Sequence, residues 1–163
     1  MISEEKIRSC ISDVYSEIIS IRRDIHQHPE LSEHEERTEQ VISTWLTRWG
    51  IPHTTGVAGH GVVGVIQGKA APQPAPKYEA VAIRADNDAL PIQESVASDF
   101  ASCNPGVMHA CGHDIHTAML LGTAKILKSL EHEFSGAVKL FFQPSEETIG
   151  GANQMIQAGC MQQ

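Results

Sequence analysis

Apolar residues recur at steps of three and four over the first part of the chain, which is the spacing of an amphipathic helix. Between residues 4 and 26 the repeating positions are Ile7, Ile11, Val14, Ile18, Ile21 and Ile25. This helix should end near His28-Pro29, because the residue before a proline is pushed out of the helical region. A second helix is predicted over residues 33–49, since Gly50 follows it and glycine is typical of helix ends.

Three shorter apolar runs predict strands. They span residues 62–66, 80–85 and 137–142, and such runs bounded by turn residues are typical of strands. Residues 70–76 are rich in alanine and proline and should form an exposed loop.

Two further helices are expected, over residues 114–130 and 151–158. Asp114 is the predicted N-cap of the first, with Thr117 three positions later, and Gly159 should end the second. The resulting order is helix, helix, strand, strand, helix, strand, helix. It predicts a layered α/β fold with a crossover connection through the helix that follows His113.

Polar clusters stand where these elements begin and end. Asp86 and Asp88 follow one predicted strand, and Glu146 and Glu147 follow another. The segment 108–116 opens the helix between those strands and holds one thiol, three imidazoles and one carboxylate. Because ligands of open α/β sheets collect beyond the carboxyl ends of the strands, we expect the three clusters to form one site.

The ligand types point to metal-assisted hydrolysis. Cys111 and His113 are borderline-soft ligands that suit zinc and its first-row neighbours. Of the two glutamates, one can bind metal while the other moves a proton between water and a leaving group. An Asp that follows a strand can hold the ring of a ligand histidine.

Each cluster taken alone has a plainer interpretation. Cys111 and His113 could be a buried thiol beside a helix-capping pair. Glu146 and Glu147 could be a solvated acidic turn, and Asp86 and Asp88 could cap or make turns.

The other histidines and cysteines lack ligand spacing. Surface or capping positions are expected for His26, His28, His34, His53, His60 and His132. His109 and His116 flank the cluster, and His116 is expected to pack behind the ligands. Small packed or loop positions are expected for Cys10, Cys103 and Cys160.

Composition narrows the class of protein. The 163-residue chain is 41% hydrophobic and 20% charged, which is normal for one globular domain with a core. Its formal net charge is −8, so neither nucleic acid nor an anionic membrane is expected as a partner. The N-terminus is polar and acidic, and no apolar run approaches the roughly 18–20 residues of a membrane span. We expect a cytoplasmic protein whose cysteines are free thiols.

Three ordered segments, residues 84–91, 108–114 and 142–147, resemble a known family. They are similar to the aminoacylase, hippurate hydrolase and auxin-conjugate hydrolase group of co-catalytic metallopeptidases, and residues 22–32 are similar to the opening of that family. The resemblance implies a three-layer, zinc-peptidase-like catalytic domain with a mixed sheet. It also implies an amidohydrolase that cleaves N-acyl amino acids or similar small amides with two divalent metal ions, which can be zinc, manganese, cobalt or nickel.

The resemblance also implies roles for single residues. Cys111 would be the bridging metal ligand, and His113 and Glu147 would be further ligands. Glu146 would be the general base and acid that activates the attacking water and protonates the leaving nitrogen. Asp88 would orient or support the metal cluster.

The chain departs from the family in two ways. Asn87 stands where the family commonly has methionine. Family members are also much longer and have two domains, with two more histidine ligands and a lid and dimerisation domain downstream. Residues 1–163 are therefore expected to be the N-terminal part of the catalytic domain of a homo-oligomeric enzyme. The alternative is a catalytically incomplete fragment or paralogue that serves as a metal-binding or interaction module.

Overall fold

A computed structural model describes residues 2–71, 80–148 and 150–162 of the chain. The elements are α1 (Glu4–Gln27), α2 (Glu36–Arg48), β1 (His53–Val57), β2 (Gly61–Gln67), β3 (Ala80–Asp86), α3 (His113–Ser129), β4 (Ala137–Gln143) and α4 (Gly151–Gln157). The α/β class is confirmed, and all four predicted helices are present within three residues of their predicted ends. The predicted loop at 70–76 lies outside the described residues from position 72 onward.

The sheet is mixed and has the strand order β1-β2-β4-β3. The β1–β2 and β2–β4 pairs are antiparallel, whereas β3 and β4 are parallel and are joined through α3, as the predicted crossover requires. In the β3–β4 register Asp86 lies opposite Gln143. The segments that follow these two strands therefore leave the sheet side by side at one edge, which is where the polar clusters lie.

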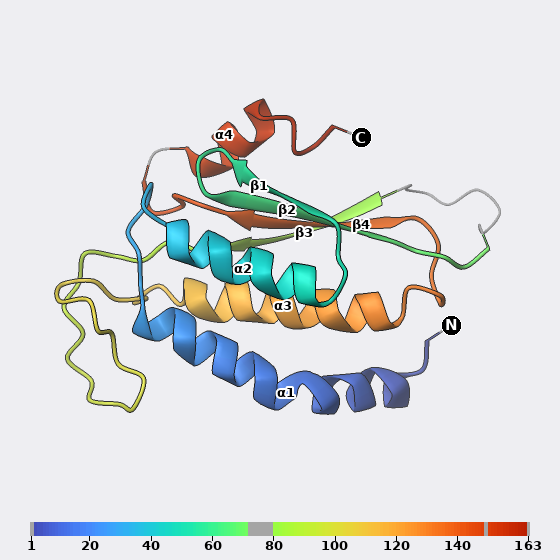
Figure 1. Cartoon of the computed structure of the whole chain (residues 1–163), viewed down its shortest axis with the longest axis horizontal. Helices are drawn as coiled ribbons and strands as arrows, with labels where there is room; N and C mark the ends of the chain where they lie inside the picture. Colours follow the sequence, from blue (N-terminus) through green and yellow to red (C-terminus); the bar gives the residue numbers. More distant parts are fainter. Residues whose placement is uncertain (1, 72–79, 149, 163) are drawn as a thin grey trace.

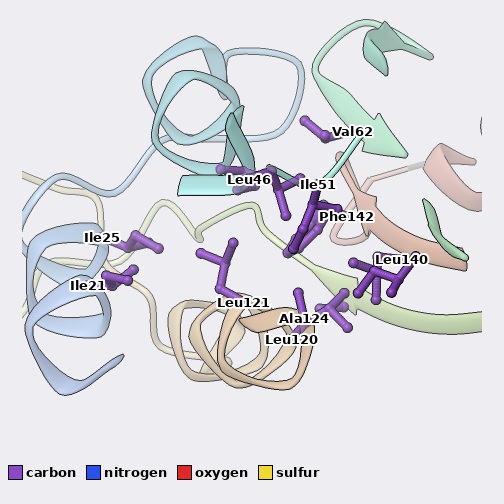
Figure 2. Packing of buried hydrophobic residues seen from close by; sticks show 13 residues of the cluster. Ile21, Ile25, Leu46, Ile51, Val62, Leu120, Leu121, Ala124, Leu140 and Phe142 are labelled. Carbon is purple, nitrogen blue, oxygen red and sulfur yellow. The ribbon is translucent and has the colours of Figure 1, made fainter. Parts of the chain in front are cut away.

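The helices form layers around this sheet. Helices α2 and α3 lie against one face, α1 packs on α3, and α4 lies on the opposite face (Figure 1). Figure 2 shows the core between them, where Ile25 of α1, Leu46 of α2, Leu121 of α3 and Phe142 of β4 are fully buried. Burial of each such side chain contributes about 1.5–3 kcal/mol.

Only part of the apolar stripe of α1 packs into the hydrophobic core. Ile21 and Ile25 are buried, but Ile7 and Ile11 near its start are 41% and 46% exposed. The stripe therefore predicted the helix correctly, and only its C-terminal half packs into the core. In the part of the chain that the structure describes, no helix combines the length and the apolar character needed to cross a membrane.

Strand β1 is absent from the sequence-based prediction. It is an edge strand, it pairs with β2 through an irregular register between Thr54 and Val57, and three of its five residues are exposed. A strand of this kind has little buried side-chain surface. Its sequence therefore lacks the apolar alternation by which a strand is identified.

Candidate metal centre

The predicted ligands meet at the carboxyl edge of β3 and β4. Ligand atoms of Cys111, His113 and Glu147 all lie within 4.8 Å of one another. The sequence separates these residues by up to 36 positions, and Cys111 and His113 lie at the start of α3, which begins near the carboxyl end of β3. The expected convergence of thiol, imidazole and acid pair is therefore seen in the fold.

The start of α3 depends on a glycine rather than on the predicted Asp114 cap. The N-cap is Gly112, with φ of 88°, and its left-handed conformation suits glycine. This turn leaves Cys111 exposed and His113 buried. Asp114 lies inside the first turn and is fully buried, so the N-cap prediction is wrong. Thr117 donates to the carbonyl oxygen of Asp86 at 2.9 Å and so ties α3 to the end of β3.

His113 is oriented by Asp88. Its Nδ1 lies 2.9 Å from the backbone oxygen of Asp88 and 3.1 Å from Oδ1. A carbonyl oxygen can only accept, so Nδ1 carries a proton, and in the neutral ring Nε2 presents a lone pair. That Nε2 faces Glu147 Oε1 at 3.6 Å and Glu146 Oε2 at 3.8 Å. In metal sites, a hydrogen bond from the ring nitrogen that does not bind the metal, here Nδ1, commonly fixes the orientation of a ligand histidine.

Asp88 is itself held on several sides. Its Oδ2 accepts from Ser32 Oγ at 2.7 Å and from the backbone amide of Glu147 at 2.9 Å. Burial alone would raise the pKa of Asp88, but the hydrogen bonds from His113, Ser32 and the Glu147 backbone outweigh it and lower the pKa to about 2. Asp88 is thus a buried carboxylate that has the contacts needed for the predicted supporting role.

The donor set fits a divalent cation. In the described part of the chain Glu147 Oε1 is buried and has no hydrogen-bond partner. The neighbouring Glu147 carboxylate, burial and the other nearby negative charges raise the pKa of Cys111. A bound cation would reverse this effect, because a coordinated thiol is deprotonated. An orphaned carboxylate oxygen, a thiol and the free Nε2 of His113 form a set that suits zinc and related ions.

Asp86 and His116 lie beside this cluster, and their ligand atoms form a second group with that of His113, all within 4.8 Å of one another. His116 Nδ1 is 2.7 Å from Asp86 Oδ1, and Arg84 Nη1 is 3.2 Å from Asp86 Oδ2. The His116 ring stacks on that of His113 at 5.7 Å between centroids, and half of its side chain is exposed. His116 therefore packs against the ligand histidine, as expected from the sequence, although half of its side chain is exposed.

His26 is buried, which contradicts the expected surface or capping position. Its Nδ1 lies 2.8 Å from Asp114 Oδ2, and its Nε2 lies 3.2 Å from Glu94 Oε1. Arg22 Nε also pairs with Asp114 Oδ2, at 2.7 Å. This buried group fastens the C-terminal part of α1 to the first turn of α3. It could not be seen in the sequence because its members are up to 92 residues apart.

Several other histidine and cysteine predictions are confirmed, whereas His53 and His60 are half-buried. His34 and His132 are exposed, and His28 is the C-cap of α1, with Nδ1 2.8 Å from the carbonyl oxygen of Asp24. All four cysteines are free thiols. His109 is buried, which lowers its pKa to about 4 and keeps the ring neutral at pH 7.

Asn87, the departure from the family pattern, is fully buried. Among the described residues neither of its side-chain polar atoms has a hydrogen-bond partner. An orphaned buried amide costs about 1–3 kcal/mol. Asn87→Met should therefore raise the free energy of unfolding by about 1 kcal/mol in urea at unchanged m-value.

The matched control for this prediction is Asn104→Met. Asn104 Nδ2 donates to the carbonyl oxygen of Pro29 at 2.8 Å, so its replacement should lower stability. A fall in stability for Asn87→Met as well would show that the longer side chain overpacks the site.

A mixed sheet covered by helices, with thiol, imidazole and carboxylate atoms gathered at the carboxyl ends of its parallel strands, is typical of metal-dependent hydrolases. The chain belongs to peptidase family M20/M25/M40, whose family model matches residues 82–163. This confirms the family resemblance of the three sequence segments.

Relatives and solved structures agree with this membership. The chain is 46% identical over 160 residues to the N-acyl-L-amino acid amidohydrolase of Geobacillus stearothermophilus, covering 98% of this chain and 42% of the relative. It is 45% identical over 150 residues to the IAA-amino acid hydrolase ILR1-like 5 of Arabidopsis thaliana, covering 92% and 33%. The Bacillus subtilis YxeP protein, described as a dinuclear metal binding peptidase, superposes with a TM-score of 0.84 at 41% identity, covering 93% of this chain and 41% of that one. The chain thus spans between 33% and 42% of the length of these proteins.

Proposed function

We propose that this chain forms part of a metal-dependent amidohydrolase that cleaves the amide bond of N-acyl amino acids or similar small amides. The observation that carries the proposal is the grouping of Cys111, His113 and Glu147 ligand atoms within 4.8 Å. The printed activities of the Geobacillus and Arabidopsis relatives support the substrate class. The YxeP description supports two divalent ions, which can be zinc, manganese, cobalt or nickel.

In this proposal Cys111, His113 and Glu147 would hold the ions. The ions supply a Lewis acid that polarises the scissile carbonyl and makes water more acidic. Glu146 accepts the proton from water and returns it to the leaving nitrogen. Its side chain is 40% exposed, against 20% for Glu147, so it can reach a substrate. Asp88 keeps His113 Nε2 directed at the ions.

We also propose that residues 1–163 are the N-terminal part of the catalytic domain, in a cytoplasmic protein that forms a homo-oligomer. Three protein ligands are too few to hold two ions, so further ligands would come from the region of the relatives that this chain does not cover. The second candidate, a catalytically incomplete module that binds metal, is favoured by the same shortage of ligands.

A metal titration and an activity assay test the proposal together. The chain should bind a divalent ion, and on its own it should not hydrolyse N-acetyl amino acids. A chimera in which residues 1–163 replace the matching segment of the Geobacillus amidohydrolase should hydrolyse them, and a chelator should abolish the activity. Hydrolysis that survives metal removal would contradict the proposal, and a chimera that binds metal without turnover would favour the second candidate.

A further inference from the structure

Ser145 forms an unusual bend directly before the two glutamates. It has φ of 54°, in the left-handed region that residues with a side chain rarely adopt, and it is buried. The bend follows β4 and Pro144, so it decides the direction in which Glu146 and Glu147 leave the sheet edge. A conformation of this kind persists only when surrounding contacts hold it.

Those contacts come from the segment that precedes α2. The backbone amide of Ser145 donates to Glu35 Oε1 at 2.7 Å, and Ser145 Oγ lies 3.3 Å from the same oxygen. Ser145 Oγ also accepts from the backbone amide of Glu33 at 2.9 Å. Glu35 is 110 positions earlier in the chain, and its side chain is fully buried.

The side chain of Glu35 does not serve its own helix. Glu35 is the N-cap residue of α2 but makes no side-chain capping bond. Glu30 caps the helix instead, because its carboxylate accepts from the backbone amides of Arg37 and Thr38 at 2.9 and 2.8 Å. The carboxylate of Glu35 is therefore directed away from α2 and onto the bend.

Burying this carboxylate is unfavourable. Among the residues that the structure describes, Glu35 Oε2 has no hydrogen-bond partner. Burial raises the pKa of Glu35, and the hydrogen bond from the Ser145 amide offsets part of that effect. An apolar side chain would fill the position at a lower free-energy cost of burial. What an apolar side chain could not do is accept the hydrogen bond from Ser145.

We propose that Glu35 is a positioning residue of the metal centre: it holds the Ser145 bend and thereby places Glu147 as a ligand and Glu146 beside it. Hydrogen bonds hold residues 145–147 at both ends: Glu35 accepts from the amide of Ser145, and Asp88 Oδ2 accepts from the amide of Glu147. This inference rests on the proposed metal-binding function of Cys111, His113 and Glu147.

Cobalt binding tests the inference without requiring turnover. Absorption from charge transfer between the Cys111 thiolate and Co²⁺ follows occupancy of the site during a titration of the chain. Glu35→Ala removes the acceptor of the Ser145 amide and should weaken Co²⁺ binding by about 10–100-fold, the effect usual for loss of a group that orients a ligand. Glu35→Gln keeps Oε1 and should restore most of the affinity. Glu36→Ala is the matched control, because the neighbouring Glu36 carboxylate is 64% exposed, and it should bind like the wild type.

Melting temperatures of the same samples separate positioning from plain stability. Wild-type Co²⁺ affinity in Glu35→Ala, with only a lower melting temperature, would overturn the inference. If Glu35→Ala does not fold, Glu35→Asp serves instead, since it keeps the charge on a side chain one methylene shorter. It should weaken binding, and unchanged affinity would overturn the inference equally. A wild-type chain whose cobalt spectrum lacks the thiolate band would overturn the proposed function and the inference with it.

Discussion

Glu146→Gln should lower kcat of the active chimera by about 10²–10⁴-fold, the usual contribution of a general acid or base. The glutamine keeps the shape of the side chain but cannot accept the proton from water. Metal binding by the same variant should remain close to that of the wild type, because Glu146 is not one of the grouped ligands. The measurement is steady-state hydrolysis of an N-acetyl amino acid, paired with metal analysis of the purified variant.

Glu147→Gln is the matched comparison, since it makes the same chemical change one residue later. It should lose metal, because Glu147 Oε1 lies 3.6 Å from His113 Nε2 and has no hydrogen-bond partner among the described residues. Its loss of activity should be partly restored by excess metal, whereas that of Glu146→Gln should not be. If Glu146→Gln loses as much metal as Glu147→Gln, the two roles are assigned the wrong way round.

The parts of this fold that the sequence predicts are those with a local signal. Strands β2, β3 and β4 are short apolar runs, and α3 lies between two of them, so the crossover and the meeting of their carboxyl ends follow from general rules. Cys111 and His113 stand one residue apart, and Glu146 and Glu147 are adjacent. Side chains that cluster along the chain in this way can be recognised before the fold is known.

What the sequence does not predict depends on partners far along the chain. Asp114 reads locally as a helix cap, but its carboxylate is used by Arg22 and His26 of α1. In the sequence, Glu35 is an ordinary charged residue near the start of a helix. Only the fold brings its carboxylate to the backbone amide of Ser145. Periodicity reports which face of an element is apolar. It carries no information on which buried polar groups will meet, and these groups are the ones that shape the metal centre.

Cys111→Ser should weaken binding of a divalent ion by at least about 100-fold, beyond the loss expected for a supporting group. The hydroxyl of serine does not ionise readily, so it cannot replace a thiolate that binds metal directly. Isothermal titration of the chain with Zn²⁺ measures the change. Cys103→Ser is the matched control, because both thiols are exposed but Cys103 lies outside the grouped ligands. Binding should also protect Cys111 from alkylation while leaving Cys103 reactive, since a coordinated sulfur is not free to attack. Equal zinc affinity in the two serine variants would remove Cys111 from the ligand set, and the remaining His113 and Glu147 would be too few to define the site.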